Sequence, residues 1–149
     1  MKLASPPPDP LPAAVRALFG QLRHAAEASP VRAAGGARLL HGEAGRERYG
    51  TRVRFFLWVE DGQLTRVQFR AYGCPYTLAV CEWLALQLES SAGDVRVTLP
   101  ALGSPADWAA ALQIPPERLG RLLVIEDALK AALNAFESGN ADMGMTKSL

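Results

Sequence analysis

Two runs of alternating side chains around an Asp-Gly pair constrain the fold of this chain more than any other feature. Apolar residues occupy every second position of residues 52–59, and a similar alternation returns over residues 64–71. This pattern is typical of strands that turn one face to a core. Asp61-Gly62 lies between the runs and favours the tight turn of a β-hairpin. We therefore predict an antiparallel hairpin, and we expect its second face, which carries Phe56 and Trp58, to be partly covered.

Apolar residues at helical spacing flank the hairpin on both sides. We expect helices over residues 11–29, 75–89 and 117–137, because apolar residues recur there every three or four positions. Ser104-Pro105 predicts the start of a further helix, with the serine as cap and the proline in the first helical position. Together these elements predict an α+β fold, a small antiparallel sheet of about three strands with helices packed on one side.

The segment before the hairpin and the two ends of the chain are less regular. Residues 37–40 predict a short strand, and the polar residues 41–48 predict a loop. We expect residues 1–10, which are rich in proline, to form a flexible arm. Residues 11–137 are expected to form a single domain, followed by a flexible tail over residues 138–149.

Composition limits the location and the partners. A net charge of +1 over 149 residues gives no general reason to expect nucleic acid or an anionic membrane as partner. No apolar run approaches the roughly 20 residues of a membrane-spanning helix. The first residues lack the apolar core of a signal peptide, so we expect a cytoplasmic protein. No phosphate-binding loop and no plausible Ser/His/Asp set is present, and we do not expect an enzyme.

The chain has two cysteines, Cys74 and Cys81, seven residues apart. Along one helix this spacing corresponds to about 10 Å, which is too far for a disulfide or for shared ligation of one metal ion. Cys74 directly precedes a predicted helix, where the helix dipole stabilises a thiolate. The alternative for Cys74 is a buried thiol that packs as a small apolar side chain. Cys81 lies on the apolar side of the helix and is expected in the core.

Three features in this order resemble the U-type iron–sulfur cluster scaffolds, the IscU/NifU N-terminal family. They are Tyr72-Gly73-Cys74 after the hairpin, Ile114-Pro115-Pro116, and the sequence Glu-Asp-Ala-Leu-Lys-Ala-Ala over residues 126–132. The resemblance covers residues 11–137. It implies an IscU/NifU-N-like fold, a role in iron–sulfur cluster biogenesis, and a cysteine desulfurase or a chaperone of the assembly system as partner.

The same resemblance implies a set of cluster ligands that this chain has largely replaced. The family assembles clusters on three cysteines, helped by an aspartate and a histidine. At the corresponding positions this chain has Tyr49, Thr51, Cys74, Gly120 and Arg121, so only Cys74 is retained. A [2Fe–2S] cluster usually takes four ligands, generally thiolates. Arg121 cannot ligate a metal, and its charge would repel one while favouring a nearby thiolate. These substitutions argue against bound iron or a [2Fe–2S] cluster.

Three functions remain open at this point. The first is a divergent scaffold or carrier, a poor scaffold by itself, which binds iron or a cluster weakly or across a homodimer with two Cys74 thiolates. The second is a degenerate interaction or regulatory module without a cluster. The third is a sulfur carrier that accepts a persulfide on Cys74. The small number of retained ligands favours the second function. The first and second functions both predict a part in iron–sulfur cluster biogenesis.

The remaining candidate residues have simpler expected roles. We expect His24 to be solvated on the polar side of the first helix, and His41 to be a surface histidine in the predicted loop. Trp83 and Trp108 are expected to be packing residues. The hairpin region is locally basic, and we expect its arginines to form a solvated face: Arg46, Arg48, Arg52, Arg54, Arg66 and Arg70.

Overall fold

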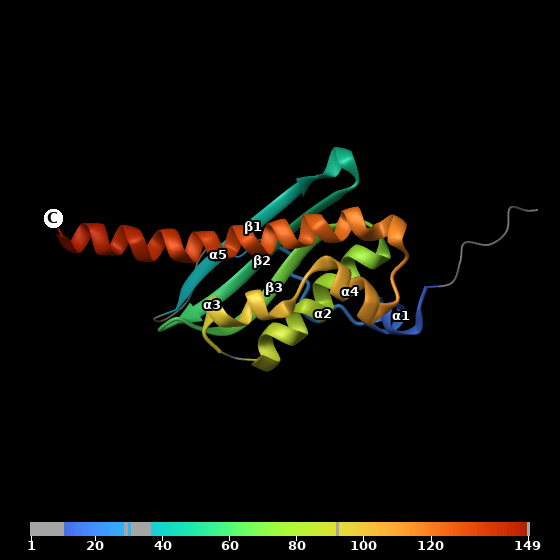
Figure 1. Ribbon diagram of the computed structural model, residues 1–149, viewed down its shortest axis with the longest axis horizontal. Helices are drawn as coiled ribbons and strands as arrows, with labels where there is room; N and C mark the ends of the chain where they lie inside the picture. Colours follow the sequence, from blue (N-terminus) through green and yellow to red (C-terminus); the bar gives the residue numbers. More distant parts are fainter. Residues whose placement is uncertain (1–10, 29, 31–36, 92, 149) are drawn as a thin grey trace, which may run out of the picture.

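The protein is described by a computed structural model, which covers residues 11–28, 30, 37–91 and 93–148. In this part of the chain, three antiparallel strands form one sheet in the order β1-β2-β3 (Figure 1). The strands are β1 (Arg38–Arg46), β2 (Thr51–Glu60) and β3 (Gln63–Tyr72). The predicted hairpin is β2–β3, with Phe55 opposite Phe69. The predicted α+β fold is confirmed.

Helices cover one face of the sheet. The long helix α5 (Leu119–Ser148) crosses β1 and β2, and α2 (Pro75–Ser91) packs along β3 (Figure 1). The short helix α1 (Ala13–Gly20) packs against α2. The remaining helical elements are α3 (Val95–Thr98), α4 (Pro105–Leu112) and three 3-10 turns, η1 (Glu47–Tyr49), η2 (Pro100–Leu102) and η3 (Pro116–Arg118).

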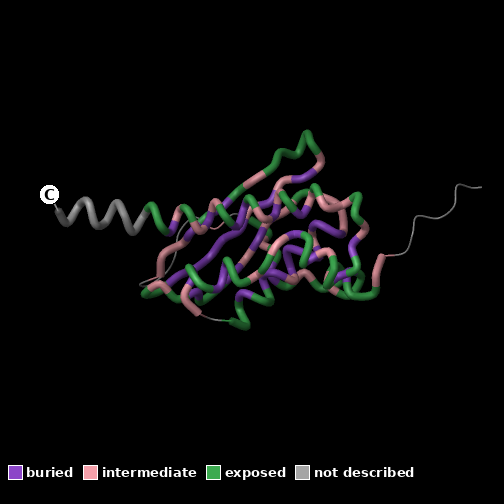
Figure 2. Tube along the Cα trace, viewed as in Figure 1, coloured by how far each residue is buried: buried purple, intermediate pink, exposed green. Residues whose placement is uncertain are grey.

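The core lies between the sheet and the helices, where the buried stretches of strands and helices face one another (Figure 2). Cys81 and Trp108 are buried in it, and Trp83 packs against it from a partly buried position, as expected. The second face of β2 is covered as well. Phe56 and Trp58 are buried; the His41 ring stacks on Phe56, and the Arg66 guanidinium lies over the Trp58 ring.

The loop predicted over residues 41–48 is wrong, because β1 extends through Arg46. Its residues pair with β2 from Arg38 opposite Val59 to Arg46 opposite Thr51. The second half of β1 is polar or small, with His41, Gly42 and Glu43, so its sequence lacks the apolar alternation that is typical of a strand. Pairing with a strong neighbouring strand outweighs such weak local preference.

The first helix is much shorter than predicted. It ends at Gly20 rather than near residue 29, and the chain then runs along the edge of β3. There the Phe69 N–H donates to the His24 carbonyl at 2.9 Å, and the Ala26 N–H donates to the Phe69 carbonyl at 2.8 Å. The unpaired backbone groups of an edge strand compete with continuation of the helix. The predicted arm over residues 1–10 lies outside the described residues.

Two other predicted boundaries can be placed. Ser104 caps α4 as predicted, and its side chain and that of Asp107 form a capping box. Helix α5 begins after the turn Pro116–Arg118 and continues to Ser148, through most of the segment for which a flexible tail was predicted. Among the described residues, no helix is long and apolar enough to cross a membrane.

Candidate functional site

Cys74 occupies the position that the sequence predicted, between the end of β3 and the start of α2. Its carbonyl accepts the Leu78 N–H at 3.2 Å, and its Sγ lies 3.6 Å from the Thr77 hydroxyl. Burial raises the pKa of the Cys74 thiol. The Thr77 N–H, the Thr77 hydroxyl, the Tyr76 N–H and the charge of Arg121 outweigh that effect, so the pKa is lower than usual. The lowered pKa favours the thiolate, which is the nucleophilic form of a cysteine.

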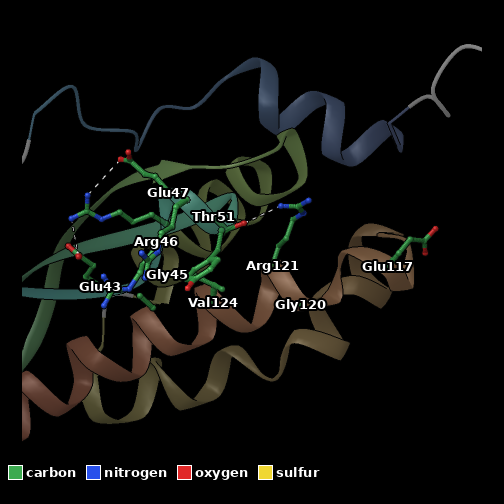
Figure 3. Close-up of a pocket in the computed structure, with 13 residues that line it drawn as sticks. Glu43, Gly45, Arg46, Glu47, Thr51, Glu117, Gly120, Arg121 and Val124 are labelled. Atoms are coloured by element: carbon green, nitrogen blue, oxygen red, sulfur yellow. Dashed lines mark hydrogen bonds and ion pairs between the residues drawn. The ribbon is translucent and has the colours of Figure 1, made fainter.

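Arg121 reaches from the first turn of α5 to the start of β2. Its Nη1 donates to the Thr51 hydroxyl at 3.2 Å (Figure 3). Gly50, between Tyr49 and Thr51, has a φ of +89°, and a Cβ there would lie 3.6 Å from Arg121 Nη1. The backbone of this turn thus passes directly under the guanidinium. Among the residues that the structure describes, no carboxylate forms an ion pair with Arg121, so its charge is available to the neighbouring thiol.

A groove of about 1120 Å³ lies where the β1–β2 turn meets the N-terminal end of α5. Tyr49, Thr51, Gly120 and Arg121 line it, so the structure brings these four sequence-predicted positions together. Cys74 is not part of the lining but lies near enough for Arg121 to act on its thiol. In Figure 3, Arg121 points toward Thr51.

The groove is rich in charge of both signs. Four arginines and three glutamates line it, together with small and apolar residues: Glu43, Ala44, Gly45, Arg46, Glu47, Arg48, Tyr49, Thr51, Arg52, Glu117, Gly120, Arg121 and Val124. Arg52 is neutralised by Glu43 at 3.0 Å and Glu47 at 3.7 Å. Arg54 also contacts Glu43, at 3.2 Å. The arginines of the hairpin region are exposed or half-exposed, as predicted, and part of their charge is compensated.

The fold has close counterparts among solved structures. The SufU protein of Fervidobacterium islandicum AW-1, named for an iron–sulfur cluster assembly scaffold role in the SUF system, matches with a TM-score of 0.60 and 12% identity, over 81% of this chain and 94% of that one. The N-terminal NifU-like protein of Brucella abortus matches with a TM-score of 0.59 and 14% identity, over 85% and 93% of the two chains. The chain has the fold of the U-type scaffolds. No protein-family model and no curated protein matches the sequence.

The residues on this U-type fold do not suit a metal cluster. Within the described ranges, no group of three or more His, Cys, Asp or Glu side chains could hold a metal ion. Cys74 is the thiol at the site, and Cys81 is fully buried in the core, where burial and Glu82 raise the pKa of its thiol. The other positions at which the resemblance implies ligands are Tyr49, Thr51, Gly120 and Arg121, and none of them has a thiol, carboxylate or imidazole. One thiolate and a fixed cation cannot replace the four ligands that a [2Fe–2S] cluster takes.

The prediction that His24 is a solvated helix residue is wrong. His24 lies beyond the end of α1, and its side chain is only 10% exposed. Its ring contacts Glu82 and Glu89 of α2. The one hint in the sequence was Glu82 itself, a charged residue in the apolar middle of a predicted helix, since buried carboxylates are rare without a partner. His41 is a surface residue as expected, with a side chain 49% exposed, but it lies in β1.

Proposed function

We propose that this chain takes part in iron–sulfur cluster assembly as a single-thiol protein, which accepts sulfur on Cys74 and holds no cluster by itself. The observation that carries the proposal is the placement of Arg121. It bonds to Thr51 where the U-type family has cluster ligands, and its charge favours the Cys74 thiolate. The process is inferred from the fold neighbours, which are named for iron–sulfur cluster assembly and for nitrogen fixation.

The chemistry of such a step needs one nucleophilic thiolate. The Cys74 thiolate attacks the outer sulfur of a persulfide on a donor protein, a new S–S bond forms at Cys74, and the donor's S–S bond breaks. The donor leaves as a thiolate, and Cys74 carries the persulfide with its proton. Attack of this kind depends on the fraction of thiolate, which the lowered pKa of Cys74 increases. A cysteine desulfurase is the donor class that fits. In this role the chain is a carrier and not an enzyme.

A second candidate function, an interaction module, is favoured by the aromatic residues around the site. Tyr49 lines the groove and is 73% exposed, and Tyr72, two residues before Cys74, is 55% exposed. Tyrosine and arginine are enriched at the energetic centres of protein interfaces. A module that docks a desulfurase or a chaperone would use this surface without needing the thiol.

The proposal is tested by loading the protein with sulfur. The chain is incubated without oxygen with a cysteine desulfurase and cysteine, and peptides are mapped by mass spectrometry in wild type, Cys74→Ser and Cys81→Ala. We expect one added sulfur atom on Cys74, retained in Cys81→Ala and absent in Cys74→Ser. If Cys74 gains no sulfur while the desulfurase still binds both wild type and Cys74→Ser, the interaction module is the correct function.

The expected absence of a cluster needs a separate measurement. After anaerobic incubation with iron and sulfide, followed by gel filtration, we expect no more than trace iron in wild type and in Cys74→Ser. Stoichiometric iron with sulfur-to-iron charge-transfer absorption, lost in Cys74→Ser, would overturn this part of the proposal. Elution of that iron with a dimer would assign the missing ligands to a second chain.

A further inference from the structure

His24 is held between two carboxylates away from the candidate site. Its Nδ1 lies 2.5 Å from Glu82 Oε2, and its Nε2 lies 2.7 Å from Glu89 Oε1. The Glu82 side chain is 1% exposed, whereas that of Glu89 is 38% exposed. The arrangement is thus a buried imidazole with one deeply buried partner and one partner that water can reach.

When both glutamates are ionised, this geometry is favourable only if both ring nitrogens of His24 carry a proton. A neutral imidazole has one N–H, and its other nitrogen is a lone-pair acceptor. Loss of the proton would therefore place a lone pair against one carboxylate. The contact to Glu89 is the one that yields, because Glu89 can be solvated and the buried Glu82 cannot move into water. A buried carboxylate without a partner is costly.

The same two glutamates also bind the backbone of the segments that His24 joins. Glu82 Oε1 accepts the His24 N–H at 2.8 Å, and Glu89 Oε2 accepts the Val67 N–H of β3 at 3.3 Å. On the other side of His24, the chain is paired with the edge of β3 through Phe69. The cluster therefore connects the N-terminal segment, α2 and β3 at one place.

We propose that His24, Glu82 and Glu89 form a pH-operated latch, which fastens residues 21–28 across the edge of β3 and loosens when the imidazolium loses its proton. The proposal is independent of Cys74 and of the function assigned to it. The Glu89 contact breaks first, and with it the bond from Glu89 to Val67, so the segment is then held at β3 by its backbone bonds and Glu82 alone.

The charged surroundings of the ring are simple. From α2 the ring contacts Glu82 and Glu89, with the buried Cys81 next to Glu82. On β3 the cluster and the N-terminal segment bond to the backbone of Val67 and Phe69, which do not titrate, and Arg70 lines a pocket beside Ala25 and Ala26. The charged residues of the N-terminal elements are exposed and turned to solvent: Arg16, Arg23 and Glu27. Burial lowers the pKa of His24, but hydrogen bonds and charges of the two glutamates outweigh it and raise the pKa above 6.5. The latch is therefore closed below pH 6.5 and loosens as the pH rises through the raised pKa.

Opening of the latch changes the surface that leads to the candidate site. Once loosened, the segment is held at Phe69 chiefly by the two backbone bonds; when these open as well, the edge of β3 is free, and a free edge is a template for strand addition by another chain. Ala25 and Ala26 also share a pocket of about 290 Å³ with Tyr72 and Leu78, on either side of Cys74 in the sequence. Movement of the segment would reshape this pocket.

Amide hydrogen exchange measured by NMR across the His24 titration tests the latch. The ring nitrogens are followed by ¹⁵N shifts, and the amides of Ala26, Val67 and Phe69 by exchange rates corrected for the intrinsic pH effect. We expect a doubly protonated ring at low pH, and protection that falls along the same titration curve. Linkage limits the fall in amide protection to about tenfold for each unit by which the pKa of His24 in the closed latch exceeds that of a free imidazole.

Two variants complete the test. Glu89→Gln removes one charge at a half-exposed position and should shift both the titration and the loss of protection to lower pH. His41→Gln, at the exposed histidine, should change neither. The latch is overturned if His24 titrates in wild type with no change in protection at Ala26 and Phe69, or if the ring carries one proton at low pH. It is equally overturned if Glu89→Gln leaves the curve in place.

Discussion

At the scale of single residues, the positive charge of Arg121 has two effects: it opposes a bound metal cation, and it favours the thiolate form of Cys74. Its guanidinium donates to the Thr51 hydroxyl, and its charge acts on the Cys74 thiol; the resemblance to the U-type family implies metal ligands at these positions. A fixed positive charge there opposes a metal cation and stabilises an anion of sulfur. The short series of donors from the start of α2, the Tyr76 and Thr77 N–H groups, acts on the thiol in the same direction. Both contributions favour the thiolate form of Cys74.

Replacement of Arg121 by glutamine should raise the pKa of the Cys74 thiol. The expected rise is below about one unit, because the interaction of partly exposed charges contributes at most about 1 kcal/mol. The pH dependence of the alkylation rate of Cys74 measures it. Arg46→Gln is the matched control, since Arg46 lines the same groove but is not among the groups that shift this thiol. Equal pKa values in wild type and Arg121→Gln would remove Arg121 from the account of thiol reactivity.

At the scale of elements, the site depends on how closely α5 lies on β1. Gly42 faces the helix, and a Cβ at this position would overlap the carbonyl oxygen of Ala128 and the backbone nitrogen of Ala132. These are backbone atoms, which cannot move aside as a flexible side chain can. The close approach fixes the path of α5 over the sheet and, with it, the place of Arg121 above the β1–β2 turn.

Gly42→Ala should therefore destabilise the fold by about 1–3 kcal/mol, the usual range for overpacking in a core. Gly120→Ala, in the same helix, provides the control, because nothing lies within 4 Å of a Cβ there. This control should be neutral or more stable by up to about 1 kcal/mol, as alanine favours a helix over glycine. Urea denaturation of both variants measures the difference. A Gly42→Ala protein as stable as wild type would show that α5 is free to shift.

At the scale of the whole molecule, the N-terminal segment closes the side of the sheet that β3 would otherwise leave open. Backbone pairing at Phe69, packing of α1 on α2 and the ion contacts of His24 act together there. Only the last of these depends on pH. Stability of the whole chain should therefore contain a contribution from His24 that vanishes in alkaline solution.

We expect the free energy of unfolding to fall between about pH 6.5 and the raised pKa of His24. A group whose folded-state pKa is raised stabilises fully below its unfolded pKa and loses that contribution as the pH rises through the folded one. The loss is about 1.4 kcal/mol for each unit of the shift. Cys74 would change the stability in the opposite direction over a similar pH range, because its pKa is lowered in the folded state. The free energy of unfolding is therefore measured by urea denaturation in a Cys74→Ser background, which removes this contribution. Adding Glu89→Gln to this background should make the fall in the free energy of unfolding smaller. An equal fall with and without Glu89→Gln would show that groups other than the His24 cluster cause it.

Much of the frame was predictable because its determinants are local. The Asp-Gly turn and the alternation around it gave β2 and β3, and Ser104 with Pro105 marked the start of α4. The place of Cys74 before α2 followed from the same pattern. Where the local pattern was weak, as in the polar part of β1, the prediction was wrong, because that strand is held by its neighbour and not by its own side chains.

The sequence by itself determined the hairpin, the helix starts and the presence of one thiol at a helix N-terminus, since turns, caps and periodicity act between residues close in the chain. The tertiary structure decided what those residues touch. Arg121 meets Thr51 across 70 positions, and His24 meets Glu82 across 58. Whether an arginine activates a thiol, or a histidine is solvated or buried between carboxylates, depends on distances in space. Those distances exist only once the helices are packed on the sheet.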